Sequence, residues 1–336
     1  MHSWSLSRCI TAALGLLLSV AAQANRYTLV DLGEFKFPEA VNTSRNVAGQ
    51  AGSAKSKAAV WRGGDWHPLG SRGSIGLAIN GRGDVVGVDV GRPIIWPRRE
   101  PSRIVALPDG AEYGVASGLA QDRTIVGQYA NPATGKDHCF IVDPAGSPAD
   151  LGLMGSGDTC HAIDVNGQHQ VVGWGNLAPG GRPSAFLWQD GQFVQLGLLP
   201  GGDSSSPYAV NQSGDVVGFA SSAERYSHAF RWRAGVLTDL GTDARYMRSS
   251  ANDINDHGDI VGDATTRDGT LHAVRFAGGR IIELAREVDE LGDWLLDVAI
   301  SVNNEGVIVG QARRQSGGGH DHLREHGFML LPVTDR

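Results

Sequence analysis

Two stretches of the sequence place histidine and carboxylate side chains where acid–base chemistry could occur. His161 and Asp164 stand three residues apart, and Asp253 takes the place of Asp164 in a later, similar stretch. A histidine beside carboxylates on a channel wall can act as a general base with a tuned pKa. The same side chains could instead cap neighbouring turns or bind channel water. We therefore treat His161, Asp164 and Asp253 as catalytic candidates and keep the structural alternative open.

A second candidate site is the glycine-rich stretch of residues 317–326, which holds His320, Asp321 and His322. Imidazole and carboxylate groups at short spacing are ligands that zinc or another divalent ion could use. No fixed helical or Cys-x-x-Cys spacing supports a metal, so a solvated loop is the simpler interpretation. We predict no other cofactor.

Aromatic and arginine side chains form a third set of candidates. Tyr113, Tyr208, Arg245, Tyr246 and Trp294 fall in or beside the connections between expected strands. Such side chains are enriched at binding hot spots, and aromatic faces also suit sugars. Because their number is ordinary for surface loops, they are ligand-binding candidates only.

Two cysteines, Cys139 and Cys160, remain beyond the first 24 residues. An exported chain in an oxidising compartment permits one disulfide, which would fix the loop that leads into the next repeat. Two unpaired buried thiols are the alternative. A metal or nucleophilic role would need a nearby base, and adjacency of His138 and His161 in the sequence is weak support for one.

The candidates are distributed over a chain in which one sequence motif, called the phrase below, recurs about every 44 residues. Each copy has a branched apolar residue, an Asn, turn residues, a β-branched pair and a Gly. The copies end at Gly49, Gly87, Gly127, Gly173, Gly218, Gly262 and Gly310. An Asn stands seven residues before the Gly in six of the seven copies, and Ala120 replaces it in the third. Because an Asn side chain can bond the backbone two residues on and start a turn, we predict a structural role for it.

Each repeat has the pattern of four short strands separated by turns. The phrase supplies two strands, a run such as Ser184-Ala-Phe-Leu-Trp188 the third, and a segment ending in Leu-Gly, such as Gln195-Leu-Gly197, the fourth. Four strands in about 44 residues is the size of one propeller blade. We therefore predict an all-β fold, a seven-bladed β-propeller of four-stranded blades, in one domain over residues 25–336.

The two ends of the chain hold the parts of one blade. The last copy supplies three strands without a Leu-Gly strand, whereas residues 26–33 match the fourth-strand pattern ahead of the first copy. Pairing residues 26–33 with residues 326–331 would complete the seventh blade and leave no open sheet edge. The alternative is an open β-solenoid, which would not need this pairing.

The tripeptide motif of the third strand, together with the segments before and after it, resembles the HAF family of bacterial extracellular repeats. His228-Ala229-Phe230 carries the motif, between the phrase of residues 211–218 and the segment Asp239-Leu240-Gly241. Ser184-Ala185-Phe186 and His272-Ala273-Val274 are partial copies. The resemblance covers essentially all of the chain after its first 24 residues. It implies exported β-propeller repeats with no shared chemistry.

Charge and the N-terminal pattern restrict the partners and the compartment. A net charge of −7 and a pI of about 5.9 argue against nucleic acid, which needs a concentrated basic surface. Residues 1–24 match a secretory signal peptide, with Arg8, an apolar run and an Ala22-Gln23-Ala24 cleavage site. An uncleaved membrane anchor is the alternative. After cleavage no stretch is long enough to span a membrane, so we expect a secreted or periplasmic monomer.

The regular repeats, with no repeated or clustered catalytic set, favour a binding or interaction module over an enzyme. Its ligand would be a small molecule, a glycan or another surface protein. The alternative is a secreted or periplasmic enzyme, a polysaccharide lyase or hydrolase, with its site at the channel mouth. A purely structural surface protein is a third possibility. Binding is expected on the face that carries the loops between the second and third strands and between successive blades.

Overall fold

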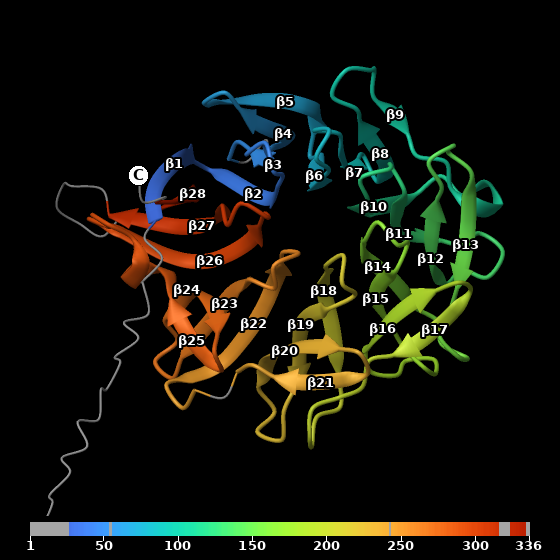
Figure 1. Cartoon of the computed structure of the whole chain (residues 1–336). Helices are drawn as coiled ribbons and strands as arrows, with labels where there is room; N and C mark the ends of the chain where they lie inside the picture. Colours follow the sequence, from blue (N-terminus) through green and yellow to red (C-terminus); the bar gives the residue numbers. More distant parts are fainter. Residues whose placement is uncertain (1–26, 54–55, 242, 316–322, 334–336) are drawn as a thin grey trace, which may run out of the picture.

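Short runs of β-branched and aromatic residues form 28 strands within the described part of the computed structural model. The structure describes residues 27–53, 56–241, 243–315 and 323–333. The strands form seven four-stranded sheets, arranged as blades around a central axis (Figure 1). The predicted seven-bladed, all-β propeller is thereby confirmed.

Each blade takes four antiparallel strands, with its first strand nearest the axis (Figure 1). Blades 1 and 2 are β2 (Lys36–Val41), β3 (Val47–Ala51), β4 (Lys57–Arg62), β5 (Asp65–Arg72), β6 (Ile75–Ile79), β7 (Val85–Asp89), β8 (Arg92–Trp96) and β9 (Arg103–Ile104). Blades 3 and 4 are β10 (Gly114–Leu119), β11 (Ile125–Ala130), β12 (Asp137–Val142), β13 (Pro148–Gly152), β14 (Cys160–Val165), β15 (Val171–Gly175), β16 (Ser184–Gln189) and β17 (Gln192–Gln195). Blades 5 and 6 are β18 (Ser205–Val210), β19 (Val216–Ser221), β20 (Ser227–Arg233), β21 (Val236–Asp239), β22 (Tyr246–Ile254), β23 (Ile260–Thr266), β24 (Leu271–Ala277) and β25 (Arg280–Glu283).

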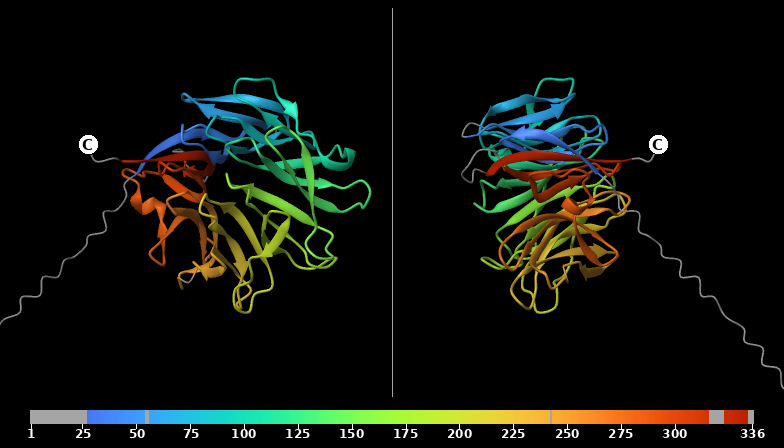
Figure 2. Two further views of the ribbon diagram at one scale, coloured as in Figure 1. Left: turned by 45° about the vertical axis from the view of Figure 1, so that its right-hand side comes forward. Right: turned by 90° about the vertical axis from the view of Figure 1, so that its left-hand side faces the viewer.

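Blade 7 combines the two ends of the chain. It contains β26 (Trp294–Val302), β27 (Ile308–Gln315) and β28 (Leu323–Pro332), and β1 (Tyr27–Glu34) is its outer strand. β1 pairs antiparallel with β28, from Tyr27 opposite Pro332 to Glu34 opposite His326. Figure 2 shows these blue and red strands side by side. This layout fits the pairing of residues 26–33 with 326–331 that the sequence suggests.

Helical structure is limited to two short 3-10 turns in the described residues, η1 (Pro108–Gly110) and η2 (Leu284–Glu287). Both lie in connections from a fourth strand to the next blade. Over the described ranges, neither is long or apolar enough to cross a membrane.

Seven clusters of buried apolar side chains lie between neighbouring blades. The β-branched pair of the repeat explains this arrangement, because successive side chains of a strand point to opposite faces. Val171 packs in the cluster that includes Cys139 of blade 3, whereas Val172 packs in the cluster that includes Val210 of blade 5. Each blade therefore depends on both of its neighbours to bury its two faces.

The final glycine of the phrase lies where two chain segments approach closely. A Cβ at Gly173 would be 2.2 Å from the carbonyl oxygen of His161 and 2.7 Å from the ring of Phe186. Phe186 is also the cross-strand partner of Gly173, so the aromatic ring covers the glycine. This contact explains why the glycine and the phenylalanine of the third strand recur together.

The recurring asparagine holds the turn of its own blade, as predicted. The side-chain oxygen of Asn211 accepts hydrogen bonds from the N–H groups of Ser213 and Asp215, each at 3.0 Å. The same two bonds occur at Asn80, Asn166, Asn255 and Asn303. The amide therefore satisfies backbone donors of a buried turn.

The nitrogen of the same amide joins neighbouring blades. Asn211 Nδ2 donates to the carbonyl oxygen of Asn255 at 3.1 Å, and Asn255 Nδ2 donates to that of Asn303 at 3.0 Å. Asn303 Nδ2 then donates to the carbonyl oxygen of Asn42 at 2.9 Å, between the last and first blades. Asn42 and Asn166 donate in the same way to the blades that follow them. A chain of amide bonds thus runs around most of the ring.

The third blade interrupts this chain on both sides, because Ala120 has no amide to donate to blade 4 and Asn80 does not donate to blade 3. Asn80 Nδ2 is instead 3.3 Å from Asp84 Oδ2 in its own blade. Arg123 of blade 3 reaches back, and its Nε donates to Asp84 Oδ2 at 2.8 Å. An ion pair therefore replaces the amide link between blades 2 and 3.

We expect Asn303→Ala to lower the free energy of unfolding by about 2–4 kcal/mol, because it leaves buried backbone groups of two blades without partners. Urea denaturation followed by tryptophan fluorescence measures this loss. The adjacent Asn304→Ala is the matched control. Asn304 donates to Asp256 Oδ2 and accepts the Asp256 N–H, but both bonds are exposed, so the variant should cost less than about 1 kcal/mol. Equal losses for the two variants would contradict the role of the Asn303 amide.

The histidine of the third strand pairs with the aspartate of the fourth. His228 Nδ1 is 2.9 Å from Asp239 Oδ2, and Asp239 Oδ1 accepts the N–H of Gly241 at 2.8 Å. The same pairs are His138 with Asp150 and His326 with Asp31. In blade 4, Gln195 Nε2 donates to Ser184 Oγ at 2.7 Å at the equivalent positions. The histidine therefore helps to hold the outer strand, which explains its recurrence without a ligand.

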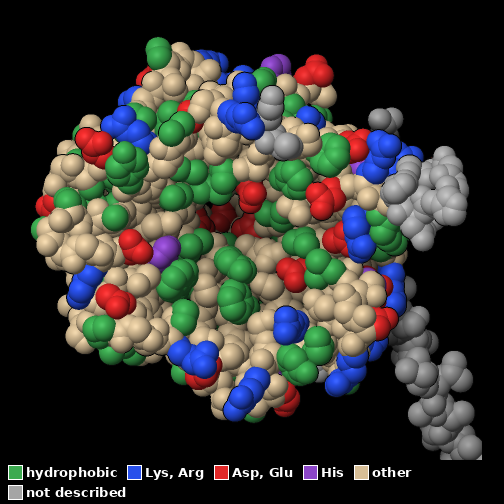
Figure 3. Space-filling model, turned by 180° about the vertical axis from the view of Figure 1, so that it is seen from behind, with side chains coloured by type: hydrophobic (Ala, Val, Ile, Leu, Met, Phe, Trp, Pro, Cys, Tyr) green, Lys and Arg blue, Asp and Glu red, His purple; other side chains and the backbone are tan. Residues whose placement is uncertain are grey.

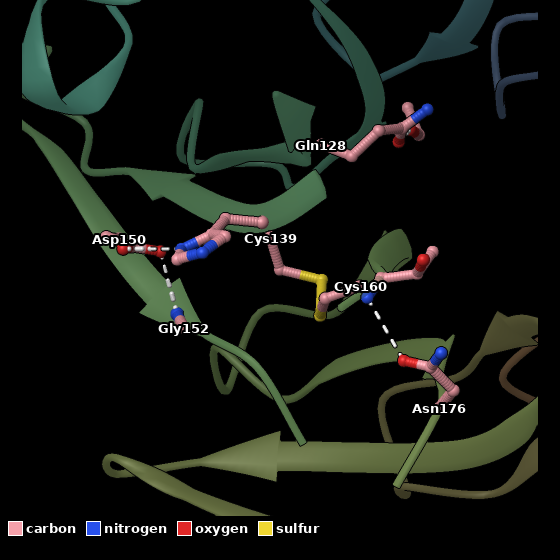
Figure 4. The surroundings of a disulfide bond; sticks show 9 residues. Gln128, Cys139, Asp150, Gly152, Cys160 and Asn176 are labelled. Atoms are coloured by element: carbon pink, nitrogen blue, oxygen red, sulfur yellow. Dashed lines mark hydrogen bonds and ion pairs between the residues drawn. A yellow bond between two sulfur atoms is a disulfide. The ribbon is translucent and has the colours of Figure 1, made fainter. Parts of the chain in front are cut away.

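Cys139 and Cys160 form a disulfide between β12 of blade 3 and β14 of blade 4 (Figure 4). Both residues are fully buried. Between blades 4 and 5, the equivalent positions hold Ala185 and Ser205, and the Ala185 N–H donates to Ser205 Oγ at 3.0 Å. The cysteines take the places of this alanine and serine. The disulfide thus replaces a recurring hydrogen bond between blades by a covalent link.

Replacing the disulfide tests this equivalence. The double variant Cys139→Ala/Cys160→Ala should lose about 3 kcal/mol of unfolding free energy, because the cross-link closes a loop of 21 residues. The variant Cys139→Ala/Cys160→Ser should recover about 1 kcal/mol through the hydrogen bond that other blades use. Urea denaturation of both variants measures the difference. Identical stabilities would show that the serine position is not equivalent.

Candidate functional site

The two aspartates proposed for catalysis lie on inner strands and bond the backbone of the next blade. Asp164 Oδ2 accepts the N–H of Val210 at 3.0 Å. Asp253 Oδ2 accepts the N–H of Val302 at 2.8 Å and the hydroxyl of Ser301 at 2.8 Å. These carboxylates therefore connect blade 4 to blade 5 and blade 6 to blade 7.

Burial at the inner edge of the ring changes the acidity of these carboxyl groups. Burial raises the pKa of Asp164 to about 7, and the charge of Asp253 adds to this rise. Hydrogen bonds from two backbone N–H groups act in the opposite direction and lower the pKa. Burial also raises the pKa of Asp253. A protonated Asp164 near neutral pH could donate a proton, which keeps acid catalysis chemically feasible at this position.

His161 is not joined to these carboxylates. Its ring stacks on Trp174, with the centroids 4.2 Å apart and the planes 8° from parallel. Burial lowers its pKa, and the charge of Asp137 opposes this shift. No hydrogen bond connects His161 to Asp164 or Asp253, all three of which are described. The sequence thus places these residues on inner strands correctly, but they do not form one bonded catalytic set.

The centre of the ring is acidic. Seen from the side opposite to Figure 1, the middle of the molecule is hollowed and acidic side chains lie in the hollow (Figure 3). Burial raises the pKa of Glu39 on β2 to about 7. Burial also raises the pKa of Asp263 on β23, although a hydrogen bond from Asn252 lowers it in part.

Two of the five ligand-binding candidates belong to the core. Tyr246 and Trp294 are the first residues of β22 and β26 rather than loop residues, and they are 5% and 8% exposed. The hydroxyl of Tyr246 donates to Glu283 Oε1 at 2.8 Å. The ring of Trp294 packs edge-on against His326. Their burial leaves no aromatic face for a ligand, which argues against this prediction for both residues.

The other three candidates are accessible. Arg245 forms ion pairs with Asp243 at 2.9 Å and Glu283 at 3.7 Å, so its charge is compensated. Tyr113 is 63% exposed. Tyr208 is 39% exposed, and its ring lies 5.5 Å from that of Phe219. Phe219, the neighbour of Tyr208, lines a cavity.

A cavity of about 650 Å³ lies beside Phe219, and we call it the blade-5 pocket. Its walls come from the loop between β15 and β16, the loop before blade 5, the segment from β19 to the start of β20, and the start of β22. They include the side chains of Arg182, Asp203, Ser221, Ser222, Arg225, Tyr226, Ser227 and Arg248. By strand order, all these loops emerge on the face predicted for binding. A second cavity, of about 610 Å³, involves Ala277, Arg280 and Glu305 near turns on the opposite face.

The blade-5 pocket carries more positive than negative charge. Arg182 Nε is 2.9 Å from Asp203 Oδ2. The guanidinium of Arg248 lies over the ring of Tyr226, 5.8 Å from its centroid. Neither Arg225 nor Arg248 forms an ion pair within the part of the chain that the structure describes. Two guanidinium groups are therefore available to a ligand.

Sequence reasoning missed most of this pocket. Arg182, Arg225 and Tyr226 lie in the loops between second and third strands, whereas the predicted aromatic set came from the loops between blades. A usable indication was present, because both classes of loop emerge on one face of a propeller. Arginines in the two loops around blade 5 therefore could have been predicted to meet.

The predicted metal ligands His320, Asp321 and His322 lie outside the described residues. Within the described ranges, no group of three or more His, Cys, Asp or Glu side chains is arranged to hold a metal ion.

No family model and no curated protein matches the sequence. An acylaminoacyl peptidase from Pyrococcus horikoshii matches with a TM-score of 0.53 and 11% identity, over 90% of this chain and 53% of that chain. TolB from Acinetobacter baumannii matches with a TM-score of 0.46 and 11% identity, over 70% of this chain and 62% of that chain. A gluconolactonase from Xanthomonas campestris matches with a TM-score of 0.41 and 12% identity, over 93% of each chain. The chain spans about half the length of the peptidase, and similarity at these identities shows the fold alone.

The pH dependence of stability tests the protonation of Asp164. Its folded pKa of about 7 is above the ordinary value of 3.8, so its contribution to stability is full below about pH 4 and is lost as the pH rises through 7. Asp164→Asn should therefore make the fall in unfolding free energy between pH 5 and pH 8 smaller, by about 1–3 kcal/mol. Urea denaturation at several pH values measures it, with the exposed Asp190→Asn as control. An unchanged pH profile for Asp164→Asn would refute the raised pKa.

Proposed function

We propose that this protein is a ligand-binding module, and that its ligand binds on the face where the blade-5 pocket opens. The observation that carries this proposal is the pocket itself, which combines unpaired guanidinium groups, serine hydroxyls and aromatic rings in one cavity. Such a mixture of convergent polar groups and apolar surface is typical of small-molecule sites. The ligand is a glycan or another small polar molecule.

The roles of the other polar residues support binding over catalysis. The recurring His and Asp side chains bond each other, and the inner-strand aspartates bond backbone groups of the next blade. These contacts give each of these groups a role in holding the blades together. The polar groups of the blade-5 pocket, in contrast, include several that no described residue occupies.

A pair of alanine-to-tryptophan variants tests which face binds. Ala223 lies at the blade-5 pocket, and Ala277 lies at the cavity on the opposite face. On an array of neutral and acidic glycans, we expect binding by the native chain to be lost in Ala223→Trp, whose indole fills the pocket, and retained in Ala277→Trp. Loss in Ala277→Trp alone, or no binding to any glycan or small molecule, would contradict the proposal.

A hydrolase or lyase is the second candidate function, and the raised pKa of Asp164 is the observation that favours it. In such an enzyme the protonated Asp164 would donate a proton to a leaving oxygen at the mouth of the channel. Incubation with polysaccharides and detection of released reducing ends tests it. Activity that Asp164→Asn abolishes while Asp190→Asn preserves it would favour the enzyme.

We further propose that the chain is exported and belongs to the HAF type of repeat protein. The Cys139–Cys160 disulfide supports export, because such bonds persist mainly in oxidising compartments. The secretory pattern of residues 1–24 lies outside the described residues. Cell fractionation with mass spectrometry of the N-terminus tests it, and a chain in the periplasm or medium that begins at Asn25 is the expected result.

A further inference from the structure

We propose that the blade-5 pocket binds an acidic monosaccharide unit, a sugar that carries a carboxylate, such as a uronic acid. This inference deepens the proposed binding function and rests on it. Two features of the pocket carry the argument: its uncompensated positive charge, and the hydroxyl and aromatic groups around the guanidinium groups.

The charge of the pocket selects for an anion. Arg182 is neutralised by Asp203, whereas Arg225 and Arg248 have no acidic partner among the described residues. A planar guanidinium matches a carboxylate with two parallel hydrogen bonds. The blade-5 pocket therefore suits a negatively charged group.

Arg225 stands at a turn position where another blade has glycine. Arg225 has a φ of 64°, in the left-handed region that favours glycine. The equivalent position in blade 6 is Gly269, with a φ of 87° in a turn closed by the same type of hydrogen bond. A left-handed conformation is less favourable for a residue with a Cβ than for glycine. Arg225 is one of several non-glycine residues with a positive φ in the described residues, among them Arg45, Arg123 and His169. The conformation therefore does not by itself assign a role to the guanidinium, and Arg225→Gly can remove the side chain without disturbing the turn.

The remaining groups suit a sugar ring rather than a bare anion. The hydroxyl of Ser227 has no partner among the described residues, and the Ser222 hydroxyl donates to the exposed Glu224 at 3.0 Å. Phe219 and Tyr226 supply aromatic surface at the same cavity. A volume of about 650 Å³ falls within the usual range of small-ligand sites. Hydroxyl groups of a sugar can thus be bonded while its carboxylate lies near the guanidinium groups.

Isothermal titration calorimetry with sodium glucuronate tests the inference on the native protein. Sodium acetate provides a simple anion, and glucose provides a neutral sugar of the same size. We expect measurable binding of glucuronate, at least ten-fold weaker binding of acetate and glucose, and loss of affinity as salt is raised. Equal affinities for glucuronate and acetate would mean that a carboxylate alone is recognised, and this result would overturn the proposal.

Variants of the pocket locate the binding. Arg225→Gly and Arg248→Ala should each weaken glucuronate binding about ten-fold or more, because each removes a charge-assisted contact. Arg225→Gly should also leave the fold as stable as before or more stable, which separates lost binding from lost structure. Arg267→Ala, in the equivalent loop of blade 6, is the matched control and should bind normally. Unchanged affinity in Arg225→Gly and Arg248→Ala would refute the site.

The outcome also distinguishes this inference from the proposed function. If Ala223→Trp abolishes binding of neutral glycans while glucuronate does not bind the native protein, the face is correct and the acidic ligand is wrong. If neither glucuronate nor any arrayed ligand binds, both proposals fail.

Discussion

The ring depends on a side-chain amide that performs two tasks in five of its seven blades. Its oxygen holds the turn between the first two strands, and its nitrogen bonds the carbonyl oxygen of the corresponding Asn in the next blade. The bond from Asn303 to Asn42 links the last blade to the first, at the place where β1 and β28 also pair. Because the apolar clusters lie between blades, anything that fixes the angle between two blades also fixes their packing. The amide chain and the packing therefore stabilise the ring together.

The number of blades and the role of the Asn in its turn were predictable, because both depend on residues within a single repeat. The bond to the next blade was not, since its partner lies more than forty residues away and depends on how two blades are placed. The disulfide illustrates the difference. From the sequence alone, two unpaired thiols remained an alternative to a disulfide. In the structure, Cys139 and Cys160 are bonded and occupy the positions at which Ala185 and Ser205 make a hydrogen bond between the next two blades.

The candidate site was predicted less well, because it depends on where strands begin and on which segments of the chain meet. Tyr246 and Trp294 were placed in loops, but β22 and β26 begin at these residues and turn their rings into the core. The extent of these long inner strands is set by pairing with β23 and β27, which the residues alone do not specify. The blade-5 pocket brings together four separate segments of the chain. A pattern within one repeat cannot indicate such a site.

A regular scaffold makes its irregular residues informative. Arg225 stands at a turn position where blade 6 has Gly269, and its side chain lines the blade-5 pocket. The central claim is that this side chain serves a ligand. A crystal structure of the protein grown with glucuronate tests it most directly. We expect the sugar carboxylate within hydrogen-bonding distance of the Arg225 and Arg248 guanidinium groups, whereas a sugar bound in the channel or on the opposite face would refute the proposed site.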